Sequence, residues 1–101
     1  MIVALIDFEV SPESRADLLE ALQPLVVEAR KVAGNVSYRS STDSENGAHV
    51  GMMHEWETID HFRAYASSDL FRRISKILRP AMTTVPISRR LNTTSIEEVR
   101  G

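Results

Sequence analysis

The alternation of apolar and polar residues along the chain predicts four β-strands. The segment 2–10 is rich in β-branched residues and alternates at its end, which indicates a strand with one buried face. Further strands are predicted over 36–41, 49–57 and 85–91. The last of these contains Pro86, which cannot donate a ladder hydrogen bond, so we expect it at an edge of the sheet.

A helix is predicted between the first two strands. Apolar residues from Leu18 to Val32 are spaced +4, +3, +4 and +3, which forms one stripe along a helix. Ser11 followed by Pro12 is typical of a capped first turn, and Gly34 is placed to end the helix in a left-handed conformation. Because the ring of Pro24 should clash with the preceding turn, we expect a kink or break there.

A second helical region and a hairpin complete the pattern. Between the second and third strands, the polar segment 42–47 ends in Asn-Gly, which accepts positive φ cheaply and predicts a hairpin. Thr58 is a candidate N-cap for a helix over 59–66, and the residues 67–69 can cap a second helix. Pro80 is expected to stop that second helix.

The order β-α-β-β-α-β in about 100 residues is typical of an α+β, ferredoxin-like unit with an antiparallel sheet and helices on one face. We expect residues 1–91 to form this domain and 92–101 to form a polar C-terminal tail. The other face of such a sheet needs a cover, and a second copy of the chain would supply it. A homodimer is therefore predicted.

Composition excludes several classes of function. The 101 residues carry a formal net charge of −2, which argues against nucleic acid as a partner. The absence of Cys removes disulfides, thiol nucleophiles and Cys-based metal sites. No apolar run approaches the roughly 20 residues that a spanning helix needs, so we expect a cytoplasmic protein without a membrane partner.

Four short segments carry a resemblance to a known family: Gly34-x-x-x-Tyr38, His54-Glu55-Trp56-Glu57, Thr58-Ile59-Asp60-His61-Phe62 and Ser67-Ser68-Asp69-Leu70-Phe71. Over residues 2 to about 91 the chain resembles the antibiotic biosynthesis monooxygenase family. The resemblance implies a dimeric α+β barrel with a pocket between sheet and helices. It also implies cofactor-independent oxidation of aromatic compounds, with Trp56 and Arg72 at positions that match functional residues of the polyketide-oxidising branch.

The third strand carries the densest group of candidate side chains. Met52, His54 and Trp56 fall on one face of this strand and His49 on the other, which disfavours a two-His metal site. His54 is either a partly buried imidazole with a hydrogen-bond partner or a base in a pocket. Trp56 is either a core anchor, whose indole N–H needs a partner, or a surface for a ring.

We hypothesise a monooxygenase that uses O2 and no cofactor, because the chain has no motif for a flavin or a nicotinamide. The substrate, a small electron-rich aromatic of the anthrone, phenol or quinol type, would supply the electrons. Ring binding is assigned to Trp56 together with residues of the strands and the following helix: Met52, Phe62, Tyr65 and Tyr38. His54 would accept the proton, and Arg72 or Tyr65 would stabilise the oxyanion.

The alternative is a non-catalytic dimeric module of the same fold that binds a small molecule or serves in a stress response. Met52 and Phe62 stand where the polyketide-oxidising branch has Asn and Tyr, which favours this alternative. Tyr65 and Ser75 stand where the haem-degrading branch has Trp and His, so haem cleavage is not expected.

Overall fold

A computed structural model describes all residues, 1–101. It contains four strands and three α-helices, with 3₁₀ turns at Pro12–Ser14 and Arg79–Ala81. In chain order the elements are β1 (Ile2–Glu9), α1 (Arg15–Ala29), β2 (Asn35–Ser41), β3 (His49–Trp56), α2 (Ile59–Ala66), α3 (Asp69–Leu78) and β4 (Ile87–Asn92). Every predicted strand is present, and its bounds lie within two residues of those predicted.

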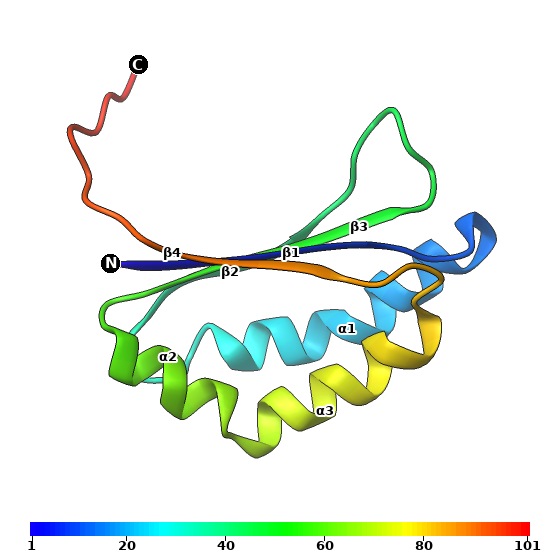
Figure 1. Ribbon diagram of the computed structural model, residues 1–101, viewed down its shortest axis with the longest axis horizontal. Helices are drawn as coiled ribbons and strands as arrows, with labels where there is room; N and C mark the ends of the chain where they lie inside the picture. Colours follow the sequence, from blue (N-terminus) through cyan, green and yellow to red (C-terminus); the bar gives the residue numbers. More distant parts are fainter.

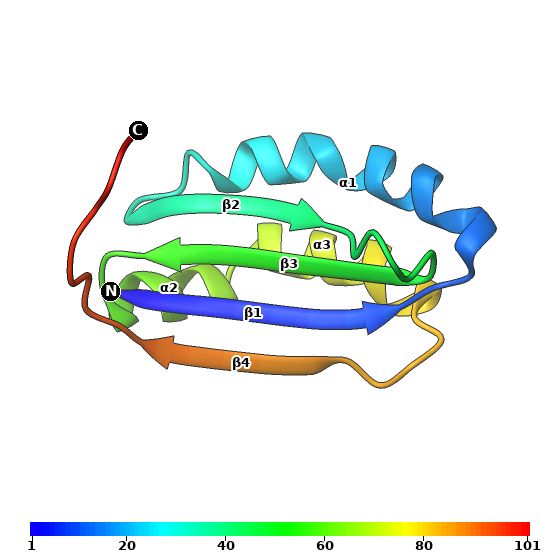
Figure 2. The same ribbon diagram turned by 90° about the horizontal axis from the view of Figure 1, so that it is seen from above.

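The four strands form one antiparallel sheet in the order β2-β3-β1-β4. All three helices pack beneath one face of this sheet, and the other face carries no layer (Figure 1). Seen from above, β2 and β4 are the two edge strands (Figure 2). The order and the one-sided helical layer confirm the predicted ferredoxin-like α+β fold.

The first helix differs from its prediction at two points. The expectation at Pro24 was a kink or a break, and α1 runs from Arg15 to Ala29 with Pro24 inside it, so the helix is not broken there. Ser11 makes no capping hydrogen bond with its side chain, because a 3₁₀ turn intervenes before the helix. The buried stripe of α1 packs against the sheet. The stability gained from this packing outweighs the loss of the one backbone hydrogen bond that a proline removes.

Gly34 behaves as predicted and has a second role. Its φ is +81°, in the left-handed region that favours glycine. A Cβ at this position would lie 2.2 Å from Cγ of His61 on α2. Gly34 therefore lets the chain turn from α1 into β2 while α2 packs directly against that turn.

The predicted caps of the two later helices are confirmed. Thr58 accepts a hydrogen bond from the backbone N–H of His61, and Ser68 accepts one from the backbone N–H of Phe71. α3 ends at Leu78, before Pro80. The predicted β2–β3 hairpin is also present, but Gly47 does not take positive φ, because the loop is held by side-chain hydrogen bonds instead.

The core lies between the sheet and the helices. Trp56, Leu22 and Val50 are fully buried there, and Tyr65 and Val26 nearly so. Alternation along β3 places Val50, Met52, His54 and Trp56 toward the helices, as predicted. The opposite face of the sheet carries apolar side chains that are partly or largely exposed.

Candidate active site

One cavity lies between the sheet and the helices, with a volume of about 150 Å³. It opens beside the edge strand β4, whose residues are all exposed. Most of its wall is apolar and comes from β1, β3, α2 and α3. Its lining includes Ala4, Ile6, Tyr38, Met52, His54, Phe62, Tyr65, Phe71, Ile74, Ser75, Leu78, Arg79, Met82, Pro86, Ser88, Arg89 and Arg90.

The strand register explains where the cavity is. Tyr38 of β2 pairs with His54 of β3, His54 pairs with Ala4 of β1, and Ala4 pairs with Arg90 of β4. These four residues form one row across the whole sheet on its helix-facing side. Ala4 is the small member of the row, so it leaves space between His54 and Arg90 and serves as the floor of the cavity.

Trp56 fixes the orientation of the His54 ring. The indole Nε1–H of Trp56 donates to Nδ1 of His54 over 2.7 Å. In neutral His54 the remaining proton is therefore on Nε2. Every fully shielded side-chain nitrogen and oxygen in the chain has a partner, and Nε2 of His54 has none, so this N–H reaches the space of the cavity.

Burial, and secondarily the charge of Arg90, lower the pKa of His54 to about 4. The imidazole is consequently neutral at pH 7. Its Nδ1 lone pair is occupied by the indole N–H, and its Nε2 carries the proton, so the ring offers a hydrogen-bond donor to the cavity. In this geometry His54 presents a hydrogen-bond donor to the cavity, whereas the role expected from the sequence was that of a proton acceptor.

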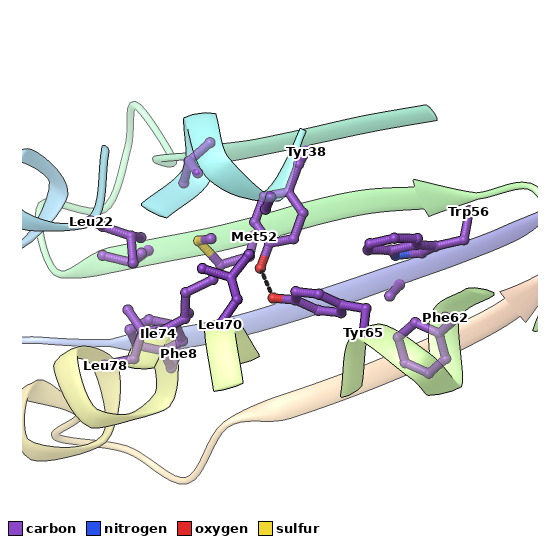
Figure 3. Close-up of a cluster of buried hydrophobic side chains, with 14 of the residues drawn as sticks. Phe8, Leu22, Tyr38, Met52, Trp56, Phe62, Tyr65, Leu70, Ile74 and Leu78 are labelled. Carbon is purple, nitrogen blue, oxygen red and sulfur yellow. Dashed lines mark hydrogen bonds between the residues drawn. The ribbon is translucent and has the colours of Figure 1, made fainter. Parts of the chain in front are cut away.

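Two tyrosines close the inner end of the cavity. The hydroxyls of Tyr38 and Tyr65 lie 2.5 Å apart and share one hydrogen bond (Figure 3). Both rings are almost completely buried, and burial raises the pKa of each phenol. One hydroxyl donates to the other, so the pair retains one further O–H that can donate, and neither tyrosine is a base at neutral pH.

Arg72 lies on the exposed side of α3, away from the cavity. Its side chain is 62% exposed, lies beside Asp69 and donates to the carbonyl of Ser67. It does not line the cavity. The arginine that does so near the ring-binding residues is Arg90, whose guanidinium carbon lies 5.2 Å from the centre of the Phe62 ring.

Arg90 is the residue that sequence reasoning missed. In the sequence Arg89 and Arg90 are adjacent, near the end of the last predicted strand. The signal that could have identified Arg90 was the strand register, because pairing Arg90 with Ala4 turns it toward the helices and pairing Arg89 with Leu5 turns it away. Periodicity alone does not determine that register.

The remaining predicted residues divide into two groups. Met52, Phe62, Tyr65 and Tyr38, all assigned to substrate binding, line the cavity together. Trp56 does not line it, since the indole is 0% exposed and stacks on Tyr65 with ring centres 4.8 Å apart. The position of Trp56 is thus that of a core residue, which was one of the two alternatives. It affects the cavity only through its hydrogen bond to His54.

The face of α2 that reaches the cavity carries Phe62 and Tyr65, which are the buried residues of this helix, whereas Ile59 is 40% exposed. The hydrogen bond to Tyr38 compensates the phenol oxygen of Tyr65 for burial. A polar residue could therefore replace an aliphatic one on the inner face.

The fold and its cavity define a class, a ferredoxin-like α+β domain with an apolar pocket between sheet and helices. Within that class, the family model described as "Antibiotic biosynthesis monooxygenase" matches residues 1–76. The chain belongs to the antibiotic biosynthesis monooxygenase family, as its motifs had indicated. Among curated proteins, none matches the sequence.

Solved structures with the same fold share little sequence with this chain. A conserved protein from Methanosarcina mazei Go1 has a TM-score of 0.84 at 20% identity, covering 92% of each chain. A protein from Nitrosomonas europaea has a TM-score of 0.85 at 10% identity, covering 94% of this chain and 100% of its own. One from Caulobacter crescentus CB15 has a TM-score of 0.85 at 15% identity, covering 93% of this chain and 90% of its own. The last two carry names that place them among antibiotic biosynthesis monooxygenases, and the likeness concerns the fold.

None of the three helices has the length and apolar character needed to cross a membrane.

Proposed function

We propose that the protein is a cofactor-independent monooxygenase that oxidises a small electron-rich aromatic of the phenol, quinol or anthrone type with O2. One observation supports this most. The Nε2–H of His54 and the guanidinium of Arg90 flank the same apolar cavity, above the small floor residue Ala4. Two such donors can stabilise an oxyanion on an aromatic ring that lies against Phe62 and Met52.

The proposed reaction needs no external reductant. A ring hydroxyl first loses its proton, and the resulting anion transfers electrons to O2. One oxygen atom of O2 becomes a carbonyl oxygen of the product. The other leaves as water with two hydrogen atoms of the substrate, so the substrate supplies every electron. An apolar wall protects the reactive anion and its oxygen adduct from water.

In this proposal the side chains have distinct roles. His54 and Arg90 hold the oxyanion, and the free O–H of the Tyr38–Tyr65 pair is a third donor. Trp56 is a positioning residue, because its N–H keeps the proton of His54 on the cavity side. The substrate proton passes to water at the mouth beside β4, since the cavity wall contains no carboxylate.

Oxygen consumption by the purified protein tests the proposal. We expect uptake above buffer with at least one compound of a panel of hydroquinones and anthrones. Arg90→Met should lower kcat/KM by about 10² if it removes one oxyanion donor, whereas Arg72→Met, on the exposed side of α3, should leave it unchanged. Absence of uptake with the whole panel would overturn the proposed reaction.

A non-catalytic binding module remains the second candidate function, and a specific observation favours it. No carboxylate lines the cavity, and His54 presents a donor, so no side chain there can accept a proton at pH 7. A ligand of the folded state raises the melting temperature by mass action. Stabilisation by an aromatic compound that is recovered intact, without oxygen uptake, would select this candidate.

We also propose that two copies associate through the open face of the sheet. This face carries the apolar residues Val3, Leu5 and Met53, together with Ile87 at 63% and Leu91 at 44% exposure. Such a surface is unfavourable in water and suits a self-complementary contact. Sedimentation equilibrium should give a dimer mass for the native chain and a monomer mass for Met53→Glu. A native monomer at micromolar concentration would refute this.

A further inference from the structure

The cavity has an unusual balance of charge. The titratable side chains on its helix-facing side are Tyr38 from β2, His54 from β3, Tyr65 from α2, Arg79 from the turn after α3, and Arg90 from β4, whereas the side chain of Arg89 points to the open face of the sheet. β1 and α3 contribute none, and no Asp or Glu reaches the wall. The site is therefore positive, with donors and no acidic partner.

The two arginines of the cavity, Arg79 and Arg90, have no carboxylate partner in the chain. The arginines that do pair with carboxylates are Arg72, Arg73 and Arg100, all outside the cavity. The guanidinium groups of Arg79 and Arg90 make neither an ion pair nor a hydrogen bond to another residue, unlike those of Arg15, Arg30, Arg72, Arg73 and Arg100. A guanidinium beside an apolar wall interacts more strongly with an anion than it would in open water.

We propose that this cavity selects organic anions, binding an aromatic phenolate or carboxylate in its already ionised form. The anionic oxygen would lie above Ala4, between the Nε2–H of His54 and the guanidinium of Arg90. The inference rests on the proposed function for the location of the ligand, and it adds the ligand's charge state. A neutral ligand would leave Arg90 without a partner, and an ionised one pairs with it.

The size of the cavity narrows the ligand further. An apolar cavity of about 150 Å³ holds one benzene-sized ring, and the volume here is the same. The enclosed part of the ligand is therefore a single aromatic ring against Phe62 and Met52. Any larger portion must extend through the mouth beside β4, toward Arg79.

The colour of 4-nitrophenol provides the test, because the phenolate absorbs visible light and the phenol does not. The compound is electron-poor, so its binding is measured without turnover. Absorbance would be followed from pH 5 to 9, with and without saturating protein. We expect the bound compound to ionise at a pH at least one unit lower than the free compound, which corresponds to about tenfold tighter binding of the anion. The neutral isostere 4-nitroanisole should bind at least tenfold more weakly at pH 8.

Two variants and one control make the result specific. Arg90→Met should remove most of the shift in ionisation, while Arg72→Met should keep it. Ala4→Leu fills the floor of the cavity and should abolish binding of both compounds, with circular dichroism confirming that the variant is folded. Equal binding of 4-nitroanisole and 4-nitrophenolate, or no shift, would overturn the proposal. That outcome is independent of oxygen uptake, so the charge preference and the reaction can fail separately.

Discussion

The buried imidazole of His54 links the stability of the fold to pH. Unfolding exposes the ring to water, where its pKa returns to about 6.5; in the fold the pKa is about 4. Between these values the unfolded chain binds one proton more than the folded chain. Stability is therefore complete above pH 6.5 and is lost as the pH falls toward 4.

The size of this effect follows from the two pKa values. One proton changes the free energy of unfolding by about 1.4 kcal/mol per pH unit, so the interval amounts to about 3 kcal/mol. Because His54 is only 8% exposed, solvent screening should reduce this little. For a domain whose total stability is about 5–15 kcal/mol, the loss is substantial.

Urea denaturation at pH 7, 6, 5 and 4, followed by circular dichroism, measures this effect against His54→Phe. The variant leaves the Trp56 N–H unpaired, so its stability at pH 7 is lower. Its free energy of unfolding, however, lacks the pH dependence that comes from protonation of His54. The contributions of the carboxylates are the same in both proteins and cancel when the two curves are subtracted. Between pH 6.5 and 4 we expect the free energy of unfolding of the native protein to fall by about 3 kcal/mol relative to that of the variant. Parallel curves, or an NMR titration of His54 near pH 6.5, would refute this reasoning.

Three further predictions concern stability. Tyr38→Phe and Tyr65→Phe should each lower the free energy of unfolding by about 1–3 kcal/mol, because each leaves the other buried hydroxyl without its partner. Since the two residues share one hydrogen bond, the double variant should lose clearly less than the sum of the single losses. Additive losses in urea denaturation would contradict the pairing. Gly34→Ala should lower the melting temperature because of its positive φ and its overlap with His61, and adding His61→Ala should recover only the part due to overlap. Ser68→Ala should cost about 1 kcal/mol through loss of the α3 cap, and an unchanged denaturation midpoint would show that the cap is dispensable.

Much of the fold follows from local chemistry in the sequence. The caps Thr58 and Ser68, the left-handed Gly34 and the period-2 pattern of β3 depend on neighbouring residues, and each was predicted correctly. Pro24 does not break α1, because the effect of this proline depends on how α1 packs on the sheet. Local propensity cannot report that tertiary contribution.

The site was harder to predict because it combines distant strands. Met52, Phe62 and Tyr65 lie within fifteen residues, and the sequence grouped them correctly. Arg90 enters the cavity only through the pairing of β4 with β1, 86 positions away at Ala4, and no periodicity specifies that register. The donor character of His54 likewise depends on one hydrogen bond from Trp56, which decides the tautomer.

The position of Arg90 on an edge strand ties ligand affinity to local unfolding. β4 is hydrogen-bonded to β1 alone, and its residues are exposed, so it can detach while the remaining sheet stays intact. Each detachment removes the cation from the site, which lowers the apparent affinity by the fraction of molecules in which β4 is docked. A ligand held between His54 and Arg90 should therefore slow amide hydrogen exchange along β4, although it contacts few of those amides.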